Sequence, residues 1–522
     1  MAPAIQWFFN GWMDPMNRTY RSLWNESLGA WVAASEISHA RGKRGGSLVA
    51  LAAAGSVFAA LPARRLRAGL ATALVALSAL GWTSFAEAQA VDCSVAPYNA
   101  YNGTASCMGL SSKASGIGAT ALGSLAVSDV LGGLAVGYSS HSAAQNSISL
   151  GFGAYSAGIN SIYLGARTGP TTGALAGGAI AIGTDVTANG GNAIAVGTIA
   201  VAGSNFATAV GYSTRATALR SVAVGNEAAA TDEAATAVGN SARAQGNSSL
   251  ALGAQALAMG ASTVAVGQGA GAGSTTANTG SVAVGIAAGT LVSGAQNTAM
   301  GGGIPSVMRG AGSGVTGTRN VALGTGDGTV AYDANLDAAA GSLVSGNDNV
   351  AIGTNAGIAV AGNATTSIGL NAAASATSAV AVGTGTVASN INTVALGASA
   401  TATGAGDSAL GTFANASGGN STALGVSSSA SGGRAFAGGW GSSASGADAA
   451  AIGTRSNAAG ISSAALGNLA NASADFSLAM GNQAVSAGIG SVAAGSGASA
   501  AAGGAGAVGN NAAATLCRST AL

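Results

Sequence analysis

The sequence is poor in the residues from which nucleic-acid-binding proteins build their sites. Charged residues make up 7% of the chain and aromatic residues 4%, well below ordinary globular usage. Beyond residue 90 there is one lysine, Lys113, and ten basic residues stand against thirteen acidic ones. A near-neutral chain of this kind lacks the clustered positive charge that binds phosphate backbones. The composition therefore predicts no nucleic-acid partner.

Histidine is scarcer still, with His39 near the N-terminus and His141 alone in the rest of the chain. One isolated histidine is a poor basis for a Ser/His/Asp triad, and no His/Cys cluster has zinc spacing. We interpret His141 as a surface residue. Glu227, Asp232 and Glu233 lie close together, but a polysaccharide-cleaving β-helix needs a denser acidic cleft, so we interpret them as a solvated edge. We expect no enzymatic activity, no cofactor and no metal site.

Two glycine-rich motifs are also weak. Gly267, Gly269, Gly271 and Gly273 imitate a phosphate-binding loop, but such a match arises by chance in a chain with 86 glycines. The strand–loop–helix context of that motif is missing. Calcium-binding nonapeptide repeats require a regular aspartate, which this sequence does not place. Neither motif predicts a ligand.

Long apolar runs are confined to the first 90 residues. Beyond that point Gly, Ser, Thr or Asn interrupts the apolar residues every few positions, so no run approaches the ~18 residues of a spanning helix. Runs 47–63 and 68–82 flank a basic cluster, and the second resembles the hydrophobic core of a signal peptide. Small residues at alternate positions predict cleavage after Ala88 or Ala90. The alternative is a membrane hairpin, for which both runs are short.

What the sequence has in abundance is a fourteen-residue repeat. Each copy is marked by a glycine preceded by a large aliphatic residue and, before that, alanine, as in AVG or ALG. We call this glycine the core glycine and number the other positions of the repeat from it. The spacing holds from Gly123 to Gly165, from Gly183 to Gly267 and from Gly369 to Gly509. The core glycines that define the most regular copies are Gly183, Gly197, Gly211, Gly225, Gly239, Gly253, Gly267, Gly383, Gly397, Gly411, Gly425, Gly453, Gly467 and Gly481.

The columns of the repeat predict a β-solenoid. Positions −3 and −1 are large and position −2 is mostly Ala, a period of two that indicates a short strand. The second half of the repeat alternates Ala with other residues, as at Ala242 and Ala244, so each coil reads strand–turn–strand–turn. Fourteen residues leave no room for a helix. Coils stacked ~4.8 Å apart form a narrow parallel β-roll.

A single narrow roll leaves its large aliphatic side chains uncovered. Its lumen has space for Ala but hardly for Val, Leu or Ile, so identical chains packed around an axis are the natural cover. An obligate homo-oligomer is therefore expected, although the spacing alone does not fix the number of chains. The candidates for its core are the position −1 residues Val196, Val210, Val224, Val238, Leu252 and Val266.

Between Gly267 and Gly369 the interval between core glycines loosens to 18, 16, 23, 29 and 16 residues. The added residues are polar and Gly-rich, and they hold four of the acids: Asp327, Asp333, Asp337 and Asp348. Insertions in repeat proteins usually map to outer loops and often to the binding surface. Insertions tolerated without a role are the other interpretation.

The three cysteines decide little. Cys93 and Cys107 lie close together after the leader, and in an exported chain they form a local disulfide or stay free thiols. Cys517 stands alone near the end of the sequence.

Two independent stretches resemble one protein family. Residues 16–45 closely resemble the extended signal-peptide region of large autotransporter adhesins, through Tyr20, Trp24, Trp31 and their neighbours. The repeats resemble the head of YadA-like trimeric autotransporter adhesins, whose motif S-V-A-I-G-x-x-S-x-A-x-G is matched by Ser221-Val222-Ala223-Val224-Gly225.

This resemblance implies an all-β fold, a homotrimeric left-handed parallel β-roll displayed on the outer membrane of a Gram-negative bacterium. It also implies a non-catalytic adhesin, exported to the cell surface, that binds host matrix proteins, host cells or sister bacteria. Because binding in such heads is spread over a repeated surface, no single contact residue is predicted.

The predicted organisation follows from these segments. We expect translation to begin at Met16 rather than Met1, and we expect the sequence to stop within a repeat, because Ser519–Leu522 repeats Ser421–Leu424 without the following glycine. The family's stalk and C-terminal membrane anchor are not recognisable in the sequence. The expected parts are 1–15 upstream of the true start, 16–45 extended signal-peptide region, 46–90 signal peptide, 91–118 irregular lead-in, 119–285 head repeats, 286–353 head repeats with insertions, and 354–522 head repeats.

Three other functions compete with adhesion. A structural or ice-binding solenoid requires a regular threonine ladder, whereas position −3 varies among Thr, Val and Ile. A polysaccharide-active enzyme is disfavoured by the few acids and aromatics. Gly/Ala-rich disorder conflicts with the long runs of constant spacing.

Overall fold

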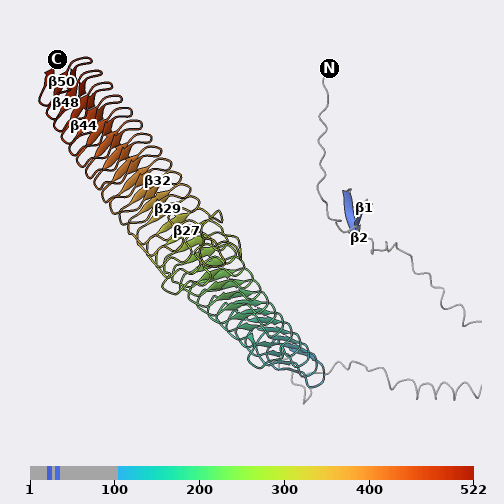
Figure 1. Cartoon of the computed structure of the whole chain (residues 1–522). Helices are drawn as coiled ribbons and strands as arrows, with labels where there is room; N and C mark the ends of the chain where they lie inside the picture. The colour runs from blue at the N-terminus through green and yellow to red at the C-terminus, as the bar shows by residue number, and fades with distance from the viewer. Residues whose placement is uncertain (1–19, 26–29, 36–103) are drawn as a thin grey trace, which may run out of the picture. The chain divides into compact units, whose positions relative to one another are not determined.

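The computed structural model describes residues 20–25, 30–35 and 104–522, in two compact units, Met1–Glu87 and Ala88–Leu522 (Figure 1). In the first unit β1 (Tyr20–Asn25) and β2 (Ala30–Ser35) form an antiparallel hairpin that pairs Trp24 with Trp31 in register. The sequence predicted no strand in this leader. The expected cleavage sites Ala88 and Ala90, and Cys93, lie outside the described residues.

In the second unit the described residues form a parallel β-solenoid without a helix (Figure 1). Its main sheet has 28 strands, from β3 (Ser106–Met108) to β52 (Thr520–Ala521), and each strand pairs with its equivalent one coil further on. The strands occupy positions −3 to −1. For example, β19 (Val222–Val224) pairs with β21 (Thr236–Val238) so that Ala223 faces Ala237. The predicted parallel solenoid is confirmed.

A second row of two-residue strands occupies positions +4 and +5 and forms two 11-stranded sheets. One sheet runs from β4 (Lys113–Ala114) to β24 (Leu257–Ala258), and the other from β31 (Ala373–Ala374) to β51 (Ala513–Ala514). Between them lies the widened segment, residues 259–372, where the second strand of each coil is replaced by turns. Its main-sheet strands are β25 (Val264–Val266), β26 (Val282–Val284), β27 (Thr298–Met300), β28 (Val321–Leu323), β29 (Val350–Ile352) and β30 (Thr366–Ile368).

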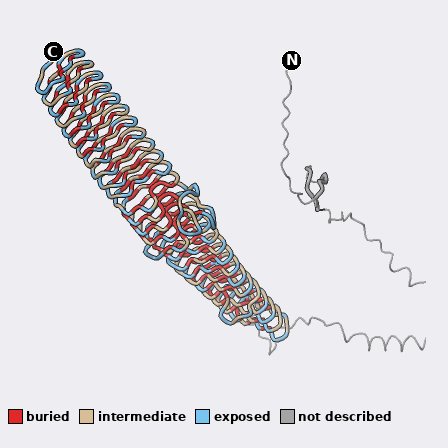
Figure 2. Tube along the Cα trace, in the orientation of Figure 1, coloured by how far each residue is buried: buried red, intermediate tan, exposed pale blue. Residues whose placement is uncertain are grey.

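The core is a file of alanines inside the coils (Figure 2). Four positions of each coil point inward, −4, −2, +3 and +5, as shown by Ala223, Ala228, Ala230 and Ala235, all 0% exposed. Two strands separated by bends of only a few residues enclose little space, so most inward side chains are small and only a few are as large as Val186, Thr214 or Asp407. The prediction that the lumen accommodates alanine is confirmed.

The core glycine is required by both conformation and space. In every coil its φ lies between 124° and 146°, a region that essentially only glycine occupies. A Cβ on Gly225 would lie 2.5 Å from the carbonyl oxygen of Gly239 in the next coil. The strand ends at the core glycine, where the backbones of successive coils approach each other most closely. Glycine therefore occupies this position in every coil.

At two further positions of the repeat the backbone is left-handed whether or not the residue is glycine. Positions +2 and −5 have φ near 55°, as at Ser213, Glu227, Arg220 and Ala234. A side chain is tolerated there because the strain of one left-handed residue is modest, of order 1–2 kcal/mol. The sequence did not reveal these columns, because only the core glycine is constant in type.

One boundary differs from the predicted organisation, and one coil departs from the standard repeat. The expected irregular lead-in, 91–118, already contains β3 and β4, so the array begins by Ser106 rather than at residue 119. The coil after Gly165 is four residues longer than the standard one, and Tyr163 occupies an interior position that is alanine or serine in every other coil except that of Cys107. The longer coil makes room for the ring, whose hydroxyl donates to the carbonyl of Ala166 at 2.9 Å.

Gly225→Ala should destabilise the solenoid strongly, by roughly 2–4 kcal/mol, because the new Cβ adds a clash to an unfavourable φ. Ser213→Ala, at a left-handed position, is the matched control and should change the free energy of unfolding by less than ~0.5 kcal/mol. Urea unfolding followed by circular dichroism measures both. Equal effects of the two substitutions would contradict this account of the core glycine.

Candidate binding surfaces

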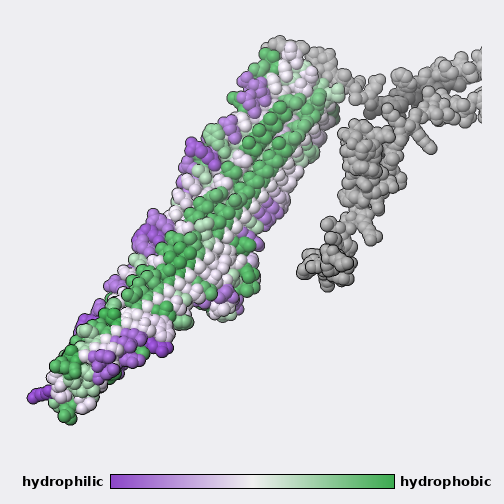
Figure 3. Space-filling view, turned by 90° about the horizontal axis from the view of Figure 1, so that it is seen from above, coloured by the Kyte–Doolittle hydropathy of each residue, from purple (hydrophilic) through white to green (hydrophobic). Residues whose placement is uncertain are grey.

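The outward side of the main sheet is a continuous apolar stripe formed by positions −3 and −1 (Figure 3). All six sequence candidates for an oligomer core lie on it. Val196, Val210, Val224, Val238 and Val266 are half-buried, and Leu252 is 42% exposed in the single chain. The stripe is therefore a long apolar surface that the described chain leaves without cover.

The stripe contains a large side chain even in coils whose residue at position −1 is small. In β40 (Phe436–Gly438) the ring of Phe436 folds over the place where a side chain at Gly438 would stand, 2.8 Å from a Cβ built there. In β42 (Ala450–Ile452) the small residue is at −3 and the large one at −1. A large residue in either column compensates for a small one in the other.

The widened segment replaces the second strand by a turn with the pattern Ala-Gly-x-x-Val. Its valines stack into a buried column, Val292, Val315, Val344 and Val360, each 2% exposed. The glycine of the pattern packs against the opposite strand: a Cβ on Gly312 would lie 2.7 Å from the Cβ of Ala299. The valines fill a lumen that is wider here than in the standard coils.

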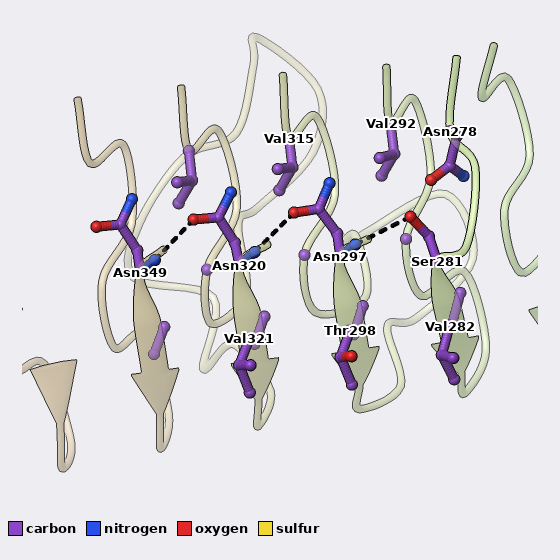
Figure 4. Close-up of a pocket in the computed structure, with 18 of the residues that line it drawn as sticks. Asn278, Ser281, Val282, Val292, Asn297, Thr298, Val315, Asn320, Val321 and Asn349 are labelled. Atoms are coloured by element: carbon purple, nitrogen blue, oxygen red, sulfur yellow. Dashed lines mark hydrogen bonds between the residues drawn. The ribbon is translucent and has the colours of Figure 1, made fainter. Parts of the chain in front are cut away.

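Buried asparagines at position −4 link the widened coils (Figure 4). The Asn297 side-chain oxygen accepts from the backbone N–H of Asn320 at 2.9 Å, and the Asn320 oxygen accepts from the N–H of Asn349 at 2.9 Å. The Asn320 amide also donates to the carbonyl of Gly346 at 3.0 Å. The sequence analysis missed this ladder, although Asn-x-Ala-x-Gly recurs only in three successive loosened copies.

The lumen between the asparagine ladder and the valine column is a narrow cavity. Two buried polar atoms that face it have no hydrogen-bond partner, the side-chain nitrogen of Asn349 and the side-chain oxygen of Asn278. Ordered water is the usual partner of such groups in a polar cavity. The arrangement therefore supports the interior of the solenoid rather than a ligand site.

The two longest insertions form a compact protrusion, which we call the knob: residues 302–310 and 325–338. Ile304 and Met308 exchange two backbone hydrogen bonds, of 3.0 and 2.8 Å. Arg309 donates its N–H to the carbonyl of Asp337 at 3.0 Å, and Asp337 donates its own to the carbonyl of Val307 at 2.9 Å. The side chain of Met308 is buried beneath these contacts. The two insertions thus fold onto each other.

Hydrogen bonds fix the acidic residues of the loops. The Thr168 hydroxyl and the N–H groups of Thr168 and Gly169 hold the pKa of Asp185 below its ordinary value. The Thr329 hydroxyl and the Asn355 amide lower the pKa of Asp327 in the same way. These carboxylates are committed to loop structure.

Arginine–carboxylate pairs link successive coils along the second bend, the turn between position +5 and the next strand. Arg319 pairs with Asp348 and Arg434 with Asp448, each through two hydrogen bonds of 2.6–2.8 Å. Hydrogen bonds from the arginines lower the pKa of both carboxyl groups. Both pairs are largely exposed, so each contributes little to the free energy of unfolding.

The residues that the sequence analysis considered for catalysis or ligand binding do not come together in one site. The imidazole of His141 is 3.6 Å from Asp129 and beside Tyr155. Glu227 is on the first bend, between the core glycine and position +4, whereas Glu233 is on the second and pairs with Arg220 at 3.7 Å. Among the described residues no three His, Cys, Asp or Glu side chains gather as a metal site. The run Gly267, Gly269, Gly271 and Gly273 lies in turns of the widened segment, with no helix after it.

Cys107 is disulfide-bonded, as one of the two alternatives for it required, and Cys517 is a free, exposed thiol. The part of the chain that the structure describes contains no helix long and apolar enough to span a membrane.

Two family models match the chain. Residues 16–65 match the extended signal peptide of the type V secretion system. The YadA head domain repeat matches at 108–126, 188–214, 216–242, 244–270, 388–414, 416–442, 444–470, 458–484 and 472–498. These matches fall on both sides of the widened segment, and only the match at 244–270 runs into its first residues. No curated protein matches the chain significantly.

Asn320→Ala should lower the free energy of unfolding by roughly 2–4 kcal/mol, because it leaves the N–H of Asn349 and the carbonyl of Gly346 buried without partners. Ser221→Ala changes the same column in a standard coil, where alanine is common, and should cost about 1 kcal/mol. Urea unfolding of both variants provides the comparison. If the two costs were the same, the ladder would have no special part in the widened segment.

Acid should open the loop at residues 166–172. The folded pKa of Asp185 is below its ordinary value of 3.8, so its stabilisation is complete above that value and is lost as pH falls through the folded pKa. Hydrogen exchange of peptides covering the loop, corrected for the intrinsic pH dependence, should show lost protection at low pH. Asp185→Asn should remove this dependence, and its persistence in that variant would assign it to another group.

Proposed function

We propose that this chain, which is a YadA-like trimeric autotransporter adhesin by its leader and its head repeats, uses the solenoid as a homotrimeric adhesive head on the bacterial surface. The family and the leader indicate export to the cell surface of a Gram-negative bacterium. The observation that carries the trimer is the apolar stripe along the 28-stranded sheet. Three chains packed by this face around one axis cover it.

The stripe suits an axis because its chemistry is uniform. Positions −3 and −1 carry Val, Ile, Leu, Met or Thr in most coils, and no charged residue stands in either column from Ser106 onward. Removing so much apolar surface from water stabilises association at about 25 cal/mol per Å². The trimer number comes from the family, and the apolar face supplies the physical reason for association.

Adhesion then follows from repetition. The outward positions of the second row and of the second bend carry variable polar, charged and aromatic residues, such as Phe206 and Phe476, which are 55% and 64% exposed. A trimer presents each of them three times, and many weak contacts on one rigid body combine into high avidity. We propose host extracellular-matrix proteins, host cells or sister bacteria as the partners, without a catalytic step.

The ice-binding alternative finds little support. The outer positions of the second row from Thr401 include Asn415, Ser429 and Asn457 rather than a continuous threonine ladder. Adhesion remains the function that the surface favours.

Val224→Asp tests the assembly, because each chain would bring an unpaired carboxylate into the apolar interface. We expect the variant to sediment as a monomer where the unchanged head sediments as a trimer. Ser248→Asp is the matched control: position −5 is exposed and already holds Asp348 and Asp448 in other coils. A trimeric Val224→Asp variant would contradict the packing.

Binding is tested on the same proteins. The trimer should bind immobilised matrix proteins, cultured cells or bacteria, and the monomeric variant should bind the same surface ~10²–10⁴ times more weakly. A trimeric head that binds none of these surfaces would contradict the adhesive function while leaving the assembly intact.

A further inference from the structure

The long insertions share one place in the coil. Residues 166–172, 302–310 and 325–338 all follow directly after a core glycine, on the first bend and before the inward position +3. This bend continues from position −1, so it borders the apolar stripe. Loops in which the chain departs most from its repeat are therefore gathered along one edge of that face. Figure 3 shows a protrusion at one flank of the stripe, about halfway along the solenoid.

The knob continues the apolar surface beyond the stripe. Met300, at position −1, is 46% exposed, and four residues later Ile304 is 54% exposed, with Val307 at 51%. Gly303, in the knob, donates its N–H to the carbonyl of Ile286 at 2.7 Å. Ile286 lies on the first bend of the preceding coil, and its side chain is 40% exposed. Exposed apolar side chains thus follow the chain from the stripe into the knob, where we call the exposed pair Ile304 and Val307 its tip.

The knob holds this tip in a fixed shape. Besides the backbone ladder between its two insertions, Ala338 donates to the carbonyl of Val330 at 2.7 Å, and the guanidinium of Arg309 lies over the ring of Tyr332 at 5.2 Å. An insertion tolerated without a role has no need of a buried Met308 or of mutual hydrogen bonds. A rigid group of exposed apolar side chains among polar loop residues is instead typical of a contact site.

We propose that the tip of the knob, Ile304 and Val307, packs against a neighbouring copy of this chain and forms a second inter-chain contact beside the apolar stripe. This inference rests on the proposed trimer. A second copy is the occupant because the apolar surface of the knob is continuous with the face that the trimer covers. Around a symmetry axis, the first bend of one chain meets the bend of the next. The three knobs of a trimer then each contact the neighbouring chain near the middle of the head.

Photo-cross-linking tests the contact. A benzophenone amino acid in place of Ile304 should link chains into dimers and trimers on a denaturing gel. The same group in place of Thr401, on the opposite side of the coil, should not. Absence of cross-links from position 304 in a head that sediments as a trimer would overturn the proposal without touching the trimer itself. A head that does not form trimers would overturn the proposed assembly first.

A second measurement separates contact from folding. Ile304→Ser with Val307→Ser should leave the β circular-dichroism spectrum unchanged, because both side chains are more than half exposed in the single chain. It should speed dissociation of the trimer roughly tenfold, since interface changes act mainly on the dissociation rate. Ile391→Ser with Ile461→Ser removes similarly exposed side chains at the tip of the second bend. Equal dissociation rates for both double variants would overturn the knob contact.

Discussion

The structure depends on the distance between stacked backbones. Parallel strands repeat every ~4.8 Å, so any atom added between successive coils must fit within that spacing. At the core glycine the next carbonyl would stand 2.5 Å from a Cβ, which leaves no alternative residue. The same tight winding favours alanine inside and directs most of the larger side chains outward. The apolar exterior, on which the proposed trimer rests, follows from the narrow interior.

Much of this could be read from the sequence because the spacing constraint acts on residue type. The glycine column, the interior alanines and the outward Val/Leu/Ile columns each leave a periodic signature. Left-handed positions such as Glu227 and Ala234 leave none, because their strain is small enough for many residues. Tyr163 was also unpredictable: its burial depends on a longer coil that makes room for the ring. The sequence did not reveal a backbone conformation at positions where that conformation allows many residue types.

The widened segment shows a second way to fill a solenoid. Where the second strand is lost, Asn297, Asn320 and Asn349 bond to backbone groups of neighbouring coils and Val315 and its equivalents occupy the added space. The sequence indicated only that the frame loosened and that the added residues were polar. It did not indicate that the interior changes from alanine to an amide ladder, or that two insertions fold onto each other. Those features depend on contacts between residues up to 29 positions apart.

The direction of the hydrogen bonds has a mechanical consequence. Strands run across the solenoid, so the bonds between coils lie along its long axis, as in the pairing of β19 with β21. A force that pulls the ends of the solenoid apart along that axis therefore acts on the hydrogen bonds between one pair of coils at a time. It does not break the hydrogen bonds of the whole sheet together. Each coil that opens releases fourteen residues, about 40 Å of additional chain, and leaves the next coil as the new end. The head is thus built to yield stepwise under tension, lengthening coil by coil while the rest keeps its shape.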